Sequence, residues 1–423
     1  MSLLIIVLLF LFIALGAPIT FALGLAALVF FITNGIPLET FAQRIAVGAD
    51  SFALLAAPFF ILAGNVMNTG GITRRIFRFA NAIIGHIPGG LGHVNVLGST
   101  IFAGMSGTAI ADAAGLGAIE IEAMKEQGYD IEFSTAVTAA SSIIGPIIPP
   151  SAVMLVYGIA AGVSVSKLFM GGLLPGILIA ILLMIMVAYY TKKNKYPRGN
   201  AFSFKELWRS FKESIWALLT PVIIVGGILS GVFTATEAGA IASAYAIIVS
   251  VLIYKEMKPK DLIKVLYNTA ISSGVVLLIV STASAFGWCL VYDRMPQNTA
   301  QWLINVINSK FLLLVALTLI YLFLGTIMSA TSIILTTVPI FVPVVKLMGI
   351  DLVYFGVYIS ILMSIGTVTP PVGTVLFILS KITNMSIEKM TRVLKPWYGI
   401  LIFALLLLLL FPQIVTFLPE ILF

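Results

Sequence analysis

Two short segments of this chain place hydroxyl side chains next to glycine, and the first of them lies between two apolar stretches that are each too short to cross a bilayer. Residues 104–109 read Gly-Met-Ser-Gly-Thr-Ala, and residues 325–331 read Gly-Thr-Ile-Met-Ser-Ala-Thr. A helix that turns back at such a segment exposes carbonyl and hydroxyl oxygens, which are hard ligands suited to Na⁺. The N-terminus of the returning half-helix offers donors and positive dipole to a carboxylate. Both segments therefore predict turns that hold a cation and an anion.

Each turn is followed by a segment that should interrupt a second apolar helix. Residues 145–151 read Gly-Pro-Ile-Ile-Pro-Pro-Ser, and residues 366–371 read Gly-Thr-Val-Thr-Pro-Pro. Proline removes a backbone donor and disfavours helix in the residue before it, so both segments should break a helix. We expect each turn to form one ion site with its neighbouring break, and we expect an organic substrate between the two sites.

The turns and breaks occur twice because residues 102–175 repeat as residues 323–396, at a constant offset of 221 positions without a gap. Chance matching in an apolar chain would not favour glycine and proline. One such motif is explained as well by close helix packing, but duplication of both favours a transporter's binding site. The identical pairs include Phe102/Phe323, Gly104/Gly325, Ala109/Ala330, Ile119/Ile340, Lys125/Lys346, Gly128/Gly349, Asp130/Asp351, Ile144/Ile365, Gly145/Gly366, Pro149/Pro370, Pro150/Pro371, Leu155/Leu376, Leu173/Leu394 and Pro175/Pro396.

Composition indicates that the elements around these motifs lie in a membrane. The chain is 60% hydrophobic and only 10% charged, and its 423 residues have room for about ten spans. The single cysteine, Cys289, excludes an intrachain disulfide, and we expect no metal beyond Na⁺ and no organic cofactor. The net charge of +7 is explained by basic cytoplasmic loops better than by nucleic acid.

The basic residues also predict the orientation of the chain. Seven of them crowd residues 191–213, which should form a cytoplasmic loop. Tracing outward from this loop places both termini in the periplasm. It makes segments 91–127 and 311–346 re-enter the membrane from opposite sides. We therefore predict an all-α polytopic membrane protein with an inverted repeat, two re-entrant helical hairpins and about 10–11 transmembrane helices.

Several motifs resemble the large membrane subunit of the tripartite ATP-independent periplasmic (TRAP) transporters. The resemblance extends over essentially the whole chain. It implies a sodium-coupled importer with an elevator fold, in which a transport domain slides past a fixed scaffold. It also implies a bacterial inner-membrane location. The matching segments are Gly104–Leu116, Gly128–Tyr129, Gly145–Ser151, Lys167–Phe169, Leu174–Gly176, Gly231–Ala240 and Val368–Gly373.

The resemblance further implies partners and a domain plan. The partners would be a small four-helix membrane subunit, a periplasmic substrate-binding protein and a small organic acid such as a C4-dicarboxylate or sialic acid. Residues 1–90 and 214–308 would form the scaffold, and residues 91–190 and 309–423 the transport domain. In the transport domain, hairpins are expected at 91–127 and 311–346, and broken helices at 131–161 and 352–380.

Site residues follow from the motif positions that match the family. The first sodium site would use Ser106, Thr108 and Gly145, and the second Ser329, Thr331, Gly366 and Thr369. The substrate would contact Gly107, Pro149, Pro150, Ser151, Ala330, Pro370 and Pro371. Related second hairpins often carry an acidic residue near the position of Ser329, so the neutral serine here alters the charge balance of that site.

Two carboxylates lie near these motifs without belonging to them. Asp112 follows the first turn and would be an intramembrane charge with a role in ion binding or gating, unless water reaches it. Glu237 stands at the start of a helix, where it either caps that helix or contacts the moving domain.

Three arginines spaced along residues 72–84 predict an amphipathic arm at the membrane interface.

Other functional classes fit the sequence less well. A stand-alone divalent-anion/sodium symporter is the nearest alternative, and a pore would pass substrate without Na⁺. An intramembrane serine protease would use Ser106 as nucleophile with a histidine base. Both histidines precede Ser106, and the second copy has no serine at the equivalent position. The chain is therefore not expected to be an enzyme.

Overall fold

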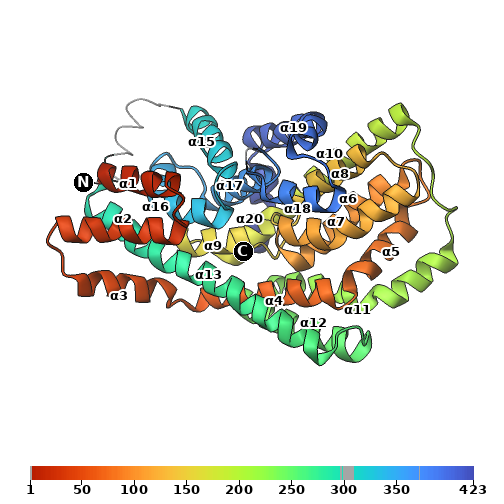
Figure 1. Cartoon of the computed structure of the whole chain (residues 1–423), viewed down its shortest axis with the longest axis horizontal. Coiled ribbons are helices and arrows are strands. Elements are labelled where there is room, and N and C mark those ends of the chain that lie inside the picture. The colour runs from red at the N-terminus through yellow and green to blue at the C-terminus, as the bar shows by residue number, and fades with distance from the viewer. Residues whose placement is uncertain (1, 296–297, 299–308, 371) are drawn as a thin grey trace.

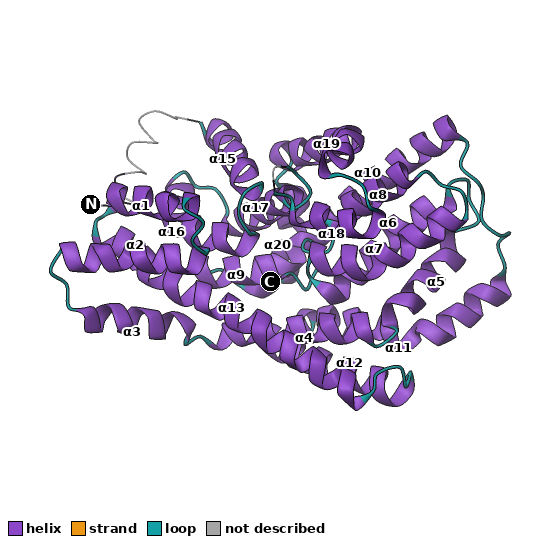
Figure 2. Cartoon of the chain, viewed as in Figure 1, coloured by secondary structure: helices purple, strands orange, loops and turns teal. Residues whose placement is uncertain are grey.

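The computed structural model describes residues 2–295, 298, 309–370 and 372–423. Within these ranges all regular secondary structure is helical, apart from an isolated bridge between Pro88 and Arg198 (Figure 2). The apolar composition explains why the chain is helical, because a helix pairs its own backbone donors and acceptors within one segment in lipid. Glycine and proline residues mark where these helices end. Pro371 lies outside the described residues.

The first half of the chain forms the first set of helices. They are α1 (Ser2–Ala14), α2 (Ile19–Thr33), α3 (Leu38–Ala49), the 3₁₀ turn η1 (Phe52–Leu55), α4 (Ala56–Thr69), α5 (Ile72–Ile84), α6 (Gly90–Ser106), α7 (Ala109–Glu126), α8 (Ile131–Ser142), α9 (Ala152–Ala161) and α10 (Val165–Asn194). A turn at Gly16 separates α1 from α2, and the predicted arm is helix α5. Helix α3 was not expected, because its Glu39 and Arg44 make it too polar for a span.

The second half repeats this pattern. Its helices are α11 (Phe204–Leu229), α12 (Ala235–Ile248) with the π-helical extension η2 (Val249–Ile253), α13 (Pro259–Tyr292), α15 (Lys310–Gly325), α16 (Ala330–Leu347), α17 (Leu352–Gly366), α18 (Thr374–Thr383), α19 (Ile387–Leu410) and α20 (Gln413–Leu422). One expected boundary is wrong: the basic loop, expected over residues 191–213, covers only residues 195–203, because α10 extends to Asn194 and α11 begins at Phe204. The C-terminal apolar stretch is divided at Phe411-Pro412 into α19 and α20.

In the described part of the chain, six helices are long and apolar enough to cross a membrane: α10, α11, α12 with η2, α13, α16 and α19. The other apolar helices are shorter, at 10–17 residues. They include α9, α17 and α18, which flank the predicted helix breaks. The chain is therefore a polytopic helical protein in which unbroken spans surround interrupted ones.

The two copies of the repeat interlock at the centre of the molecule. Helices α6 to α9 and α15 to α18 follow one another in the same order, as hairpin and then broken helix. Helix α7 packs against α18, and α9 packs against α16 and α17. The first halves of the broken helices, α8 and α17, are almost wholly buried. This arrangement brings the two breaks and the two turns toward one region.

An outer layer of longer helices borders this centre. Helix α13 packs against α2, α3, α4 and α16, while α12 packs on α4 and α11 on α5. Figure 1 shows α3, α4, α12 and α11 along one long side of the molecule, with α15 and α19 on the opposite side. Helices α6, α7, α9, α17 and α18 lie between these two sides.

Candidate functional site

The two turns and the two helix breaks meet around one cavity of about 210 Å³. The first turn contributes residues 107–110, and the second contributes residues 325–331. The remaining lining residues come from the breaks and the helices beside them: Pro146, Ala152, Val153, Ser364, Thr367, Val372, Gly373 and Thr374. Segments more than 200 positions apart in sequence thus share one small chamber.

Four helices point their N-termini at this cavity. The first residues of α7, α9, α16 and α18 all line it. The N-cap positions are held by Thr108, Ser151, Ser329 and Gly373. Free N–H groups and the positive end of the helix dipole both favour an anion at such a place. The cavity is therefore suited to a carboxylate.

The backbone of each break is bonded to the turn beside it. The Ala152 N–H donates to the Gly107 carbonyl at 3.5 Å, and the Val372 N–H donates to the Thr326 carbonyl at 3.1 Å. Gly145 and Gly366 allow this approach. A Cβ atom on Gly145 would lie 2.9 Å from the Thr108 carbonyl oxygen, and one on Gly366 would lie 2.7 Å from the Gly325 backbone.

The hydroxyls at the two turns cap helices and keep further bonding capacity. Thr108 Oγ1 accepts from the Ala111 N–H at 3.2 Å. Ser329 Oγ accepts from the Ser332 N–H at 3.3 Å and lies 2.7 Å from the Ser332 hydroxyl. A hydroxyl oxygen has two lone pairs, so Thr108 Oγ1 retains one that a cation can use, and Ser329 Oγ retains one when its own hydroxyl is the donor to Ser332. The role of both hydroxyls as ion ligands stays a prediction.

The structure divides the predicted site residues into two groups. Gly107, Thr108, Ser329, Ala330 and Thr331 line the cavity. The others in the described part of the chain lie outside its lining: Ser106, Gly145, Pro149, Pro150, Ser151, Gly366, Thr369 and Pro370. The ion and substrate roles of both groups remain predictions.

Three hydroxyls of the second group differ in how they are used. Ser151 is fully buried, and its hydroxyl donates to the Pro146 carbonyl and accepts from the Met154 N–H. Thr369 donates to the Ile365 carbonyl. Within the described residues, Ser106 Oγ is buried without a hydrogen-bond partner. A protease would need a histidine beside that oxygen, so this geometry gives no support to the enzyme alternative.

Several lining residues were not predicted as ligands. Ser364 and Thr367 lie at the end of α17, where their hydroxyls donate to carbonyls one turn earlier. Thr374 begins α18, and its buried Oγ1 has no partner among the described residues. The sequence could have indicated Thr374 as a lining residue, because it directly follows the second helix break. The first side chains of a helix that begins after a break lie next to that break.

The two predicted gating carboxylates have different surroundings. Glu237 is exposed and closes a capping box, in which its carboxylate accepts from the Thr234 N–H at 2.8 Å and the Thr234 hydroxyl at 2.9 Å. The capping interpretation accounts for all of these contacts. Asp112 lies in the first turn of α7, is only 1% exposed and does not line the cavity.

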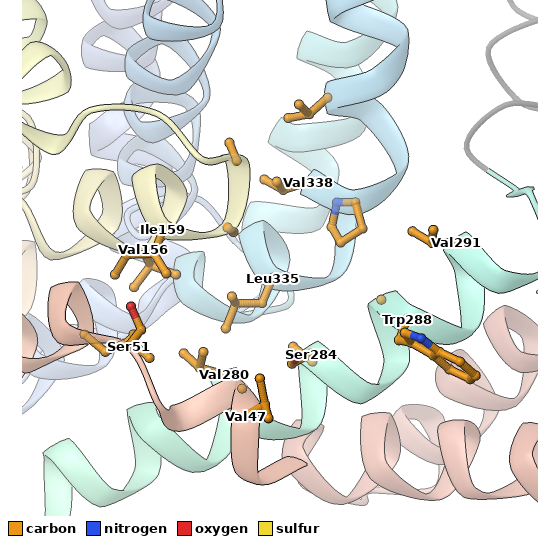
Figure 3. A pocket seen from close by; sticks show the side chains of 18 of the residues that line it. Val47, Ser51, Val156, Ile159, Val280, Ser284, Trp288, Val291, Leu335 and Val338 are labelled. Carbon is orange, nitrogen blue, oxygen red and sulfur yellow. The ribbon is translucent and has the colours of Figure 1, made fainter. Parts of the chain in front are cut away.

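A second, larger cavity of about 620 Å³ lies where α3 and α13 face α9 and α16 (Figure 3). Figure 3 shows Val156, Ile159, Val280, Leu335 and Val338 around it. None of the described residues that line it is charged. An ion or an acid would lose its hydration there without compensation, so this cavity is not a candidate ion site.

Comparison with known proteins agrees with the family resemblance. The family model described as "Tripartite ATP-independent periplasmic transporter, DctM component" matches residues 6–414. The chain belongs to this family. This DctM-family chain is therefore the large membrane permease of a TRAP system.

Individual relatives of this DctM-family chain are similar over nearly its whole length. The sialic acid large permease SiaM of Vibrio cholerae is 41% identical over 406 residues, which cover 96% of this chain and 95% of that protein. The sialic acid permease SiaT of Haemophilus influenzae is 41% identical over 408 residues. This match covers 96% of this chain but only 66% of that longer protein.

The fold of this DctM-family chain is also found in a solved structure of low sequence similarity. The YdaH transporter of Alcanivorax borkumensis superposes with a TM-score of 0.66 at 15% identity. The match covers 89% of this chain and 88% of that one. The likeness confirms the polytopic helical fold, and at this identity it extends to the fold alone.

Proposed function

We propose that this permease imports a small organic acid together with Na⁺. The observation that carries the proposal is the convergence of four helix N-termini and two hydroxyl-bearing turns on one cavity. The N-termini favour a carboxylate, and the carbonyls and hydroxyls of the turns favour cations. Two relatives are named for sialic acid, which supports an acid of this class as substrate.

Charge neutralisation is the proposed link between the ions and the acid. The cations bind at the turns and the acid binds between them, so each favours the other's binding. One bound cation offsets the charge of a monovalent acid and two offset that of a dicarboxylate, which lowers the cost of moving the acid through the membrane. Each Na⁺ that moves inward contributes about 2.3 kcal/mol at 100 mV. Two ions therefore suffice to accumulate a monovalent acid without ATP.

The proposed movement is an elevator step. The hairpins and broken helices of both repeats would shift together against α3, α4, α11, α12 and α13. A small membrane subunit and a periplasmic binding protein would complete the system in a bacterial inner membrane. Both termini of the chain would face the periplasm.

Uptake in proteoliposomes tests the proposal. The permease is reconstituted with its small subunit, and labelled sialic acid is supplied on its binding protein under an inward Na⁺ gradient. We expect Thr108→Ala and Ser329→Ala each to raise the Na⁺ concentration for half-maximal uptake by roughly tenfold, since each removes one ligand of a different ion. Thr33→Ala, on an exposed helix end, is the matched control and should have no effect.

Each alternative predicts a different result. Uptake without Na⁺, or driven by protons alone, would overturn the sodium coupling, and downhill flux without any ion would indicate a pore. A stand-alone symporter would take up free acid without the binding protein. A serine protease would lose activity with Ser106→Ala and be indifferent to Ser329→Ala.

A further inference from the structure

A chain of buried polar side chains links α6 to α8 inside the first repeat. The Ser99 hydroxyl donates to Ser141 at 3.2 Å, and the Ser141 hydroxyl donates to the Asn95 side-chain oxygen at 2.7 Å. The Asn95 amide donates to Thr138 at 2.8 Å. All four side chains are at most 1% exposed. These groups provide hydroxyl and amide oxygens deep in the protein.

Two carboxylates of α7 point at this polar chain. Asp112 lies within hydrogen-bonding reach of the Ser99 hydroxyl, and Glu120 lies against the neighbouring residue Gly98, where a Cβ atom would be 2.8 Å from its Oε1. They therefore converge on one short stretch of α6, and the missing side chain of Gly98 makes room for Glu120.

These carboxylates have no counter-charge in the described part of the chain. Both residues are 1% exposed, and no ion pair of the described residues includes either one. Both oxygens of Glu120 and one oxygen of Asp112 are buried without any hydrogen-bond partner. Buried ionised carboxylates are strongly unfavourable unless a positive charge accompanies them.

The second repeat shows that the fold does not require these polar groups. At the offset of 221, Asp112 and Glu120 correspond to Ile333 and Phe341, and Gly98 corresponds to Leu319. The polar chain corresponds to Ala316, Ile320, Ile359 and Leu362. The same hairpin and broken helix thus form around apolar side chains. The polar set of the first repeat is therefore not explained by packing.

We propose that Asp112 and Glu120, with the polar chain beside them, bind a Na⁺ ion in the first repeat, apart from the two turns. Carboxylate, hydroxyl and amide oxygens are the hard donors that suit such an ion. This inference rests on the proposed sodium coupling and adds one ion to it. The asymmetry of the repeats makes it a single site with no counterpart in the second half.

Thermal unfolding of the purified permease tests the site without requiring transport. Na⁺ is titrated against K⁺ at constant ionic strength, and the dependence of stability on Na⁺ concentration reports the number of ions bound on folding. Glu120→Gln and Asp112→Asn should each bind one Na⁺ fewer. In Na⁺-free buffer both variants should be at least as stable as wild type, because each removes an uncompensated buried charge. Glu122→Gln, an exposed neighbour on the same helix, should leave the Na⁺ dependence unchanged.

The outcomes separate this site from the sodium coupling itself. If the wild type depends on Na⁺ for stability and for acid uptake, and both variants bind as many Na⁺ ions as the wild type, the site at Asp112 and Glu120 is refuted and the sodium coupling stands. If the variants shift only the pH dependence of stability, the carboxylates bind protons and the proposal is wrong. If wild type stability and uptake are both independent of Na⁺, the proposed function fails as well. Should Glu120→Gln not fold, Asp112→Asn provides the same measurement.

Discussion

At the level of single residues, the candidate site depends on glycine where one backbone passes close to another. We expect Gly366→Ala to abolish most uptake, because its Cβ would lie 2.7 Å from three backbone atoms of Gly325. Overpacking of this kind costs about 1–3 kcal/mol and displaces the second turn. Uptake in proteoliposomes and the melting temperature in detergent measure the two effects.

Gly274→Ala is the matched control for that substitution. Gly274 lies in the interior of α13, and no atom lies within 4 Å of its ideal Cβ position. Alanine there should leave uptake unchanged and stabilise the helix by up to about 1 kcal/mol. If the Gly366 variant took up the acid as fast as this control, the close approach of the second turn to the second break would not be needed for uptake.

The helix cap at Glu237 supports a second prediction for a single residue. Thr234→Ala removes the hydroxyl that accepts from the Glu237 N–H, and it should lower the free energy of unfolding by about 1 kcal/mol. Glu237→Gln keeps the shape of the capping box and should preserve uptake. Loss of uptake in Glu237→Gln at an unchanged melting temperature would instead establish a contact with the moving domain.

At the level of elements, ion pairs connect the arm helix α5 to α11 and to the segment that follows η2. Arg78 pairs with Glu206 and Glu213 of α11. Arg75 pairs with Glu256 at 2.6 Å and covers the Tyr254 ring at 3.7 Å from its centroid. The Arg75 side chain is less exposed than that of Arg78, at 23% against 38%, so salt should screen its contacts less.

We therefore expect Arg78→Ala to cost at most about 1 kcal/mol and Arg75→Ala to cost more, since it also loses a ring contact. Melting curves in low and high KCl measure this while leaving Na⁺ constant. The loss in Arg78→Ala should shrink in high KCl, and most of the loss in Arg75→Ala should persist. Equal sensitivity to KCl would show that both arginines act through exposed charge alone.

At the level of the whole molecule, the apolar cavity between the outer helices and the repeats offers a test of the proposed sliding. Ala160 lines this cavity on α9, and Ala160→Trp would fill part of its roughly 620 Å³. If α9 and α16 move past α3 and α13, a filled cavity should slow uptake severalfold and leave acid binding intact. Uptake rates and equilibrium binding are measured on the same preparation.

A tryptophan of equal size on the outer surface serves as the control. Ile181 is 51% exposed on α10, so Ile181→Trp should change neither binding nor uptake. Normal uptake in Ala160→Trp would contradict relative movement across this cavity. Loss of binding in the same variant would show that the cavity belongs to the acid site.

Much of this protein was determined by local sequence. The apolar composition required helices, and glycine and proline at residues 104–109, 145–151 and 366–371 ended them, because these effects act within a few residues. The constant offset of 221 then revealed that the unit occurs twice. Helix α3 and the start of α11 were missed, since their polar sequences lack the signature of a complete span.

Tertiary structure alone decided which of these residues meet. Only packing of α7 on α18 and of α9 on α16 brings four helix N-termini to one cavity. It places Thr374 in the lining of that cavity. It also brings Glu120 of α7 against Gly98 of α6, a contact that the sequence of neither helix predicts. Contact between distant segments depends on how helices cross, and helical periodicity describes each helix only by itself.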